Sequence, residues 1–207
     1  MFNLSFSVKS KTDKLSQVIN NIVALSKKRV LVGVPADENE RKDEEGRPEK
    51  VGNAALAAIH NEGSELQNIP PRPFRDLGIK NTQERVNIHF LAAAKAQLND
   101  DQEKVLMSLN KAGQIARDGI KNVLRTGDGL EPLTRETLLA RTRKRKYLWG
   151  KLAKEQRKLL DRQEQRALIK ENRETIMASM VPLFDTGNLN NSISYVVEVN
   201  GERVKEE

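Results

Sequence analysis

The positive charge of this 207-residue chain is confined to one segment. Residues 135–173 contain 14 Lys or Arg and 5 Asp or Glu, whereas the rest of the chain contains 22 and 24. The pattern of the segment is helical, but its apolar stripe is thin, so a helix there buries little surface against its own chain. We therefore expect a core domain of residues 1–134 and 181–207, with residues 135–180 inserted into it as a basic, charged helical arm.

The core residues predict an α+β domain with a small mixed or antiparallel sheet. Alternating apolar and polar residues over Phe2–Lys9 and Ser192–Val199 predict half-buried strands. The continuous β-branched run Arg29–Val34 predicts a strand that is covered on both faces. Asn200-Gly201 predicts a two-residue hairpin turn near the end of the chain.

Two or three helices are expected to pack against this sheet, chiefly residues 13–27 and 101–125. The second is the clearest: it follows Asp100 or Asp101 and ends at Gly127. Gly113 and Gly119 within it indicate the close approach of another backbone, the alternative being glycines that are tolerated at a small cost in helix stability. Its apolar face comprises Val105, Leu109, Ala112, Ala116, Ile120 and Val123. That of the first helix comprises Leu15, Val18, Ile19, Ile22 and Val23.

The intervening residues predict shorter features. Residues 36–50 are mostly charged and predict a mobile loop. Residues 53–61 predict a short helix stopped by Gly63. A further helix is expected to run to about Leu98, with an apolar face of Val86, Phe90, Ala93 and Ala94. Between these two helices, residues 68–74 (NIPPRPF) predict a rigid extended turn, because residues before proline avoid the helical region.

The composition excludes several classes of chemistry. The chain has no cysteine, which removes disulfides, thiolate nucleophiles and cysteine-based zinc sites. His60 and His89 have no partners at metal-ligand spacing, and no phosphate-binding glycine motif occurs. No apolar run reaches the roughly 18 residues of a membrane span, and the N-terminus does not resemble a secretory signal. We therefore expect no enzyme activity, no cofactor, no metal and no membrane contact.

One motif is tempting as an enzyme signature. Residues 183–187 (LFDTG) match the two hydrophobic residues and DTG of aspartic proteases, in which two aspartates share a proton. Only 20 residues follow, too few for the barrel that forms such a cleft. The favoured alternative is a capped turn, in which Asp185 accepts backbone N–H bonds and Gly187 supplies a positive φ.

A basic run at the start of the arm favours nucleic-acid binding as an alternative function. Lys and Arg that neutralise phosphates add affinity without sequence specificity. Acidic residues interleave after Lys151, which favours instead a basic face that meets an acidic partner. The candidate contact residues are Arg141, Arg143, Lys144, Arg145, Lys146 and Trp149.

Three short motifs occur in order along the chain. They are AAIHNEG (57–63) with IPPRPF (69–74), AGQIARDGIK (112–121) with LEPLT (130–134), and PLFDTGNL (182–189) with SISY (192–195). Together they resemble the small neck and tail-completion proteins of tailed bacteriophages, which include the Mu-like virion-morphogenesis group. The chain departs from that pattern at Arg135, where the family usually has proline, and in residues 151–180, which exceed the usual spacer.

The resemblance implies a structural virion protein without enzyme activity. Such a protein would be assembled in the host cytoplasm into a homo-oligomeric ring, a hexamer by analogy, at the head–tail neck or the top of the tail tube. Its partners would be neighbouring neck, connector and tail-tube or tail-terminator proteins, with possible non-specific contact to genome DNA.

The same motifs supply candidate contact and turn residues. The proline-rich segment is rigid before binding, Arg72 offers a planar donor, and Phe74 either anchors a partner or plugs its own core. The contact candidates here are Ile69, Pro70, Pro71, Arg72, Pro73 and Phe74. The structural turn candidates are Pro132, Leu133, Thr134, Asp185, Thr186 and Gly187.

Overall fold

A computed structural model describes residues 11–41, 48–142, 162–171, 173–184 and 187–204. It has the α+β arrangement that the sequence predicts, with a three-stranded antiparallel sheet packed against several helices. The predicted strand Phe2–Lys9 lies outside the described residues. The elements in chain order are α1 (Lys11–Ser26), β1 (Lys28–Gly33), the 3-10 helix η1 (Ala36–Glu38), α2 (Asn53–Glu62), α3 (Phe74–Leu98), α4 (Gln102–Thr126), α5 (Arg135–Thr142), α8 (Arg162–Glu171), α9 (Arg173–Ala178), α10 (Asn188–Ser192), β2 (Ser194–Val199) and β3 (Glu202–Arg203).

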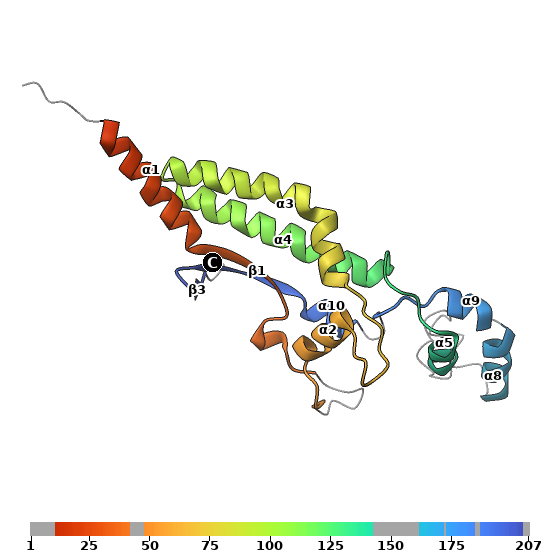
Figure 1. Ribbon diagram of the computed structural model, residues 1–207. Helices are drawn as coiled ribbons and strands as arrows, with labels where there is room; N and C mark the ends of the chain where they lie inside the picture. Colours follow the sequence, from red (N-terminus) through yellow and green to blue (C-terminus); the bar gives the residue numbers. More distant parts are fainter. Residues whose placement is uncertain (1–10, 42–47, 143–161, 172, 185–186, 205–207) are drawn as a thin grey trace, which may run out of the picture.

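The antiparallel hairpin of α3 and α4 forms the body of the molecule (Figure 1). The Asp101 side chain caps α4 by accepting from the Lys104 N–H at 3.1 Å, and Gly127 ends the helix with φ of 73°. All six apolar side chains expected on its inner face are at most 7% exposed, which confirms that prediction. α4 is therefore the central helix of the core.

Glycines bring the two helices of this hairpin unusually close. A Cβ at Gly119 would lie 2.6 Å from the Gly78 carbonyl oxygen, and a Cβ at Gly78 would lie 2.5 Å from the Ile120 Cα. The predicted close backbone approach at Gly119 is therefore confirmed. At Gly113 the prediction is wrong, because the neighbour that excludes a Cβ is the Tyr195 ring, a side chain of β2.

The sheet has the order β1-β2-β3, with Val30 opposite Val197 and Leu31 opposite Val196. The predicted turn between β2 and β3 is confirmed: Asn200 and Gly201 both have positive φ, 56° and 86°. α4 covers the face that carries Val30 and Val32. On the other face Leu31 is 48% exposed, so the prediction that β1 is covered on both faces is wrong for this chain.

α1 forms as predicted but does not pack on the sheet. The five apolar side chains of its predicted face are 42–60% exposed, and its N-terminal half extends beyond the α3–α4 hairpin (Figure 1). Its C-terminal end contacts the body through polar groups instead. Gln97 Nε2 donates to Asn21 Oδ1 at 3.5 Å, and Lys28 Nζ donates to Gln97 Oε1 at 2.8 Å. Packing of residues 13–27 against the sheet was therefore predicted wrongly.

The described part of residues 135–180 comprises α5, α8 and α9. α5 contacts α9, so the beginning and end of this segment lie side by side (Figure 1). Arg141 donates to the Val181 carbonyl oxygen at 3.3 Å, and Met177 is 8% exposed. None of the helices in the described ranges has both the length and the apolar character that crossing a membrane requires.

Candidate functional site

The three sequence motifs converge on one core cluster. Phe74 comes from the first motif, Ile120 and Leu130 from the second, and Leu189 and Ile193 from the third, and all are at most 8% exposed. The first turn of α3, the C-terminal part of α4 and α10 thereby pack around the same point, and Ala57 of α2 packs against it. The motifs therefore build a shared scaffold from segments that are far apart in the sequence.

Of the predicted extended turn 68–74, residues 69–73 lie outside any helix, while Asn68 has a positive φ of 54° and Phe74 already begins α3. The loop is bonded into this scaffold. Ser64 and Ile69 form an isolated antiparallel bridge, and the Arg72 N–H donates to the His60 carbonyl oxygen at 2.8 Å. Gly63 makes the sharp exit from α2 possible: its φ is 81°, and a Cβ there would lie 2.9 Å from the Ile69 carbonyl oxygen. The loop is thus fixed by backbone pairing as well as by its prolines.

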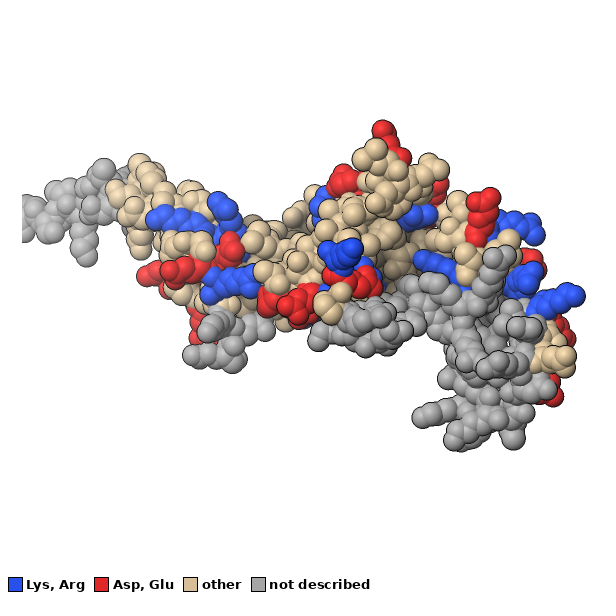
Figure 2. Space-filling model, turned by 90° about the horizontal axis from the view of Figure 1, so that it is seen from below, with Lys and Arg blue, Asp and Glu red and all other residues tan. Residues whose placement is uncertain are grey.

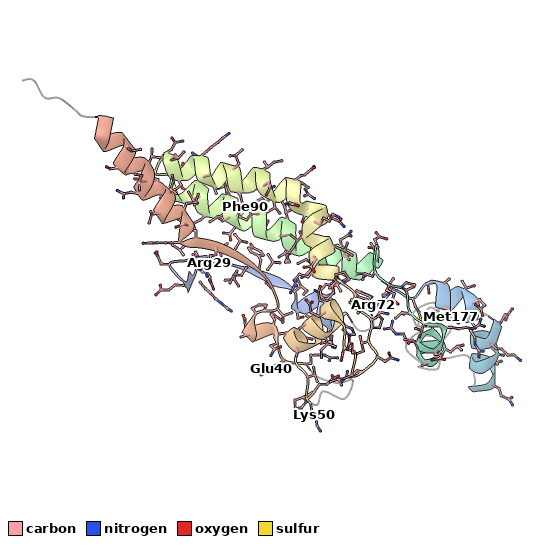
Figure 3. The ribbon with its side chains drawn as sticks, viewed as in Figure 1. Arg29, Glu40, Lys50, Arg72, Phe90 and Met177 are labelled. Carbon is pink, nitrogen blue, oxygen red and sulfur yellow. The ribbon has the colours of Figure 1, made fainter. Side chains whose placement is uncertain are left out.

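Arg72 joins the first motif to the second. Its guanidinium donates from Nε to the Glu131 carbonyl oxygen at 2.9 Å and from Nη2 to the Pro132 carbonyl oxygen at 3.4 Å. The residue is only 6% exposed, at the junction of α2, the α3–α4 hairpin and the segment leading to α5 (Figure 3). Arg72 therefore satisfies carbonyl groups of its own chain and offers no free surface to a partner.

Phe74 lies equally deep. It begins α3, is 2% exposed and packs in the core cluster. The sequence left open whether Phe74 anchors a partner or fills its own core, and the structure shows that it fills its own core. The contact candidates that retain exposure are Ile69, Pro70 and Pro73, which are half-buried, and Pro71, which is exposed. Leu66, at the tip of the same loop, is fully exposed, and sequence reasoning did not single it out.

His60, in α2, is influenced by the charges of three arginines. Burial lowers the pKa of His60 below its ordinary value, and the nearby charges of Arg72, Arg141 and Arg41 lower it further. Its Nδ1 is buried and has no hydrogen-bond partner among the described residues. The imidazole is therefore neutral near neutral pH and acts as a packed structural group.

The turn candidates are placed only in part. Thr134 begins α5, because its Oγ1 accepts from the Thr137 N–H at 3.3 Å and its carbonyl accepts from Leu138. Pro132 and Leu133 lead into that cap, with Leu133 half-buried. Gly187 adopts the predicted positive φ, 80°, at the start of α10. Asp185 and Thr186 lie outside the described residues, and so the protease-like signature is not placed.

Buried polar side chains at the junction were missed from the sequence. Asn61 is 4% exposed, and its Oδ1 accepts from the Arg75 N–H in the first turn of α3. Ser192 is 3% exposed and donates to the Leu189 carbonyl oxygen at 2.9 Å. Both lie inside the motifs, next to residues that the sequence analysis singled out. Their role is to form hydrogen bonds with backbone groups at the ends of helices, which becomes visible only in the folded chain.

The basic run of the arm lies outside the description. Arg143, Lys144, Arg145, Lys146 and Trp149 belong to the range 143–161. Over the described residues, acidic and basic side chains intermingle on the face seen in Figure 2, with neither sign covering it alone. Within the described ranges no cluster of three His, Asp or Glu residues could hold a metal ion.

Fold and site together define an α+β domain whose motif residues form an internal scaffold. No protein-family model, curated protein or solved structure matches this chain.

Proposed function

We propose that this chain is a structural subunit of a tailed-phage virion. It would form a homo-oligomeric ring at the head–tail neck or the top of the tail tube, and would complete or join the tail. In this role the chain works by shape and charge complementarity between subunits and needs no reacting centre.

The observation that supports this proposal most is the convergence of the three motifs. Motifs that resemble those of neck and tail-completion proteins contribute side chains to one buried cluster and are linked through Arg72. These motif residues therefore stabilise the fold of the domain, as expected if the protein's role is to assemble with other subunits. The exposed apolar residues of α1 further support association with other chains.

The proposal is tested on phage particles and on the isolated protein. We expect mass spectrometry to find the chain in purified particles of the phage that encodes it. Deleting its gene should leave filled heads and tails that do not join. Negative-stain images of the purified protein should show a closed annulus, with a solution mass that is a multiple of 23.4 kDa. Absence of the chain from particles, with normal assembly in the deletion, contradicts the proposal.

A further inference from the structure

α1 presents an apolar face that the described residues leave open. Ile19 is 50% exposed and Ile22 58%, and Leu15, Val18 and Val23 share the same face at similar exposure. Residues 15–26 contain no charged residue at all, although 31% of the chain is charged. Short helices in water depend on packing of their apolar face, and the centres of protein interfaces are depleted in charge. This face therefore has the character of an interface.

The sheet presents a second open surface. The face opposite α4 carries Leu31 and Val196, flanked by the charged residues Arg29, Glu198 and Arg203. It contains a shallow hollow of about 340 Å³, whose lining includes Leu31, Val196, Glu198 and Arg203. At Gly33, on the same face, a Cβ would meet nothing within 4 Å. The continuous apolar run of β1 is typical of a strand with cover on both sides. One chain thus has an uncovered apolar helix face and an open sheet face with an apolar centre and a charged rim.

These two surfaces cannot meet within one chain. Only Lys27 separates the end of α1 from the start of β1, so the helix runs on into the strand (Figure 1). Folding α1 back over the sheet would need a reversal of direction, and connections between packed helices and strands usually take about 2–6 residues. α1 therefore does not cover the sheet face of its own chain, and α1 of a second copy is free of this restriction.

We infer that α1 of one copy of this chain docks on the open sheet face of a second copy, with its apolar stripe over Leu31 and Val196. This inference rests on the proposed function for its premise that copies associate, and it names the surfaces that do so. The five α1 side chains expose roughly 450 Å² together, against about 800 Å² per partner in a standard interface. The exposed α1 side chains alone would therefore supply about half of the area that one partner buries in a standard interface.

The contact has consequences for symmetry. Helix face and sheet face are different surfaces, so each copy gives one and receives one. Such heterologous contacts close into a ring when the rotation between neighbours permits, and otherwise extend as a filament. If the rotation closes, this contact alone gives the proposed annulus without a further interface.

Cysteine pairing tests the contact directly, because the chain has no cysteine of its own. We expect a mixture of Ile19→Cys and Leu31→Cys proteins to form a disulfide-linked heterodimer on oxidation, and a chain carrying both to form a ladder of multimers. Gln17→Cys lies on the opposite side of α1 and should not link to Leu31→Cys. Linkage of Ile19→Cys to Leu91→Cys, on the exposed face of α3, instead of Leu31→Cys overturns the assignment of the sheet face.

Filling the hollow gives an independent test. Gly33→Leu places its side chain where the isolated chain has open space, so we expect unchanged helicity and thermal stability at concentrations where the protein is monomeric. Association measured by analytical ultracentrifugation should weaken at least tenfold. Gln83→Leu adds the same side chain to an exposed position of α3 and should leave association unchanged.

The outcomes separate this inference from the proposed function. An annulus that survives Gly33→Leu and shows no Ile19–Leu31 linkage overturns the contact and leaves the virion role standing. A protein that stays monomeric at all concentrations overturns the contact, and the particle composition then decides the virion role by itself. Linkage in a protein absent from particles supports the contact and contradicts the virion role.

Discussion

Adding one methyl group at Gly119 tests whether close backbone contact holds the α3–α4 hairpin together. In Gly119→Ala the new Cβ would lie 2.6 Å from the Gly78 carbonyl oxygen and 2.5 Å from Thr82 Cγ2. Thr82 is buried and its Oγ1 donates to the same carbonyl at 2.9 Å, so neither neighbour is free to withdraw. The two helices must move apart to accommodate the change.

Two effects of opposite sign decide the result. Alanine is favoured over glycine inside a helix by about 1 kcal/mol. Forcing extra atoms into a packed core costs about 1–3 kcal/mol, and more where the obstacle is backbone. We expect the clash to win, with a free energy of unfolding about 2 kcal/mol lower. For a chain of this size that corresponds to a fall in Tm of about 4–8 °C.

Thermal and urea denaturation followed by far-UV circular dichroism measure this change, and Gly113→Ala provides the matched control. At residue 113 the obstacle is the Tyr195 ring, so Tyr195→Ala should relieve the clash in the double variant. At residue 119, Thr82→Ala removes only one of two obstacles and should not restore stability. A Gly119→Ala protein with raised Tm refutes the reasoning, as does full rescue by Thr82→Ala.

Three further changes test other parts of the structure. Phe74→Ala removes a 2%-exposed ring from the shared cluster and should lower the free energy of unfolding by about 3–5 kcal/mol in urea titrations; a loss below 1 kcal/mol would contradict its plugging role. His60 has a lowered pKa in the folded protein, so the unfolded chain binds more protons as the pH falls through about 6.5. The Tm of the wild type should therefore drop more steeply than that of His60→Gln between pH 7.5 and about 5, and parallel profiles would speak against a buried neutral imidazole. Replacing Arg143, Lys144, Arg145 and Lys146 by glutamine should reduce a weak, sequence-independent binding to duplex DNA; tight binding with a steep salt dependence that the variant loses would favour the nucleic-acid alternative.

The sequence predicted α4 in full but described α3 poorly, and the reason lies in the size of the buried residues. α4 buries large apolar side chains at regular spacing, such as Val105 and Ile120, which pattern reasoning detects. α3 buries Gly78, Thr82 and Gln97 and leaves Phe90 42% exposed. A hydrophobic pattern cannot identify an inner face made of small and polar residues, because their burial follows from the closeness of the neighbouring helix.

The candidate site divides in a similar way. The turns were predictable, because Gly63, Gly127 and Gly187 mark positions where the chain needs a positive φ. The partners of the side chains were not. An arginine and a phenylalanine in a proline-rich loop suit a binding surface, and only the folded chain shows Arg72 bonded to the Glu131 carbonyl and Phe74 packed in the cluster with Ile120.

The same limit explains the failure for α1. An amphipathic pattern shows that one face of a helix needs cover, but it does not say which molecule provides the cover. The apolar face of residues 15–23 was assigned to the core of its own chain, whereas the one-residue joint at Lys27 directs the helix away from it.

The point where residues 135–180 leave the domain is also the point where they return. A Cβ at Gly127, just before the departure, would lie 2.9 Å from both Val181 Cγ1 and Pro182 Cδ, just after the return. The two ends of the segment are therefore neighbours in space, whatever the number of residues between them. Each doubling of the length of a flexible loop costs only about 0.6 kcal/mol in closure entropy. Changes in the length of this segment should therefore leave the contact between Gly127 and residues 181–182 in place.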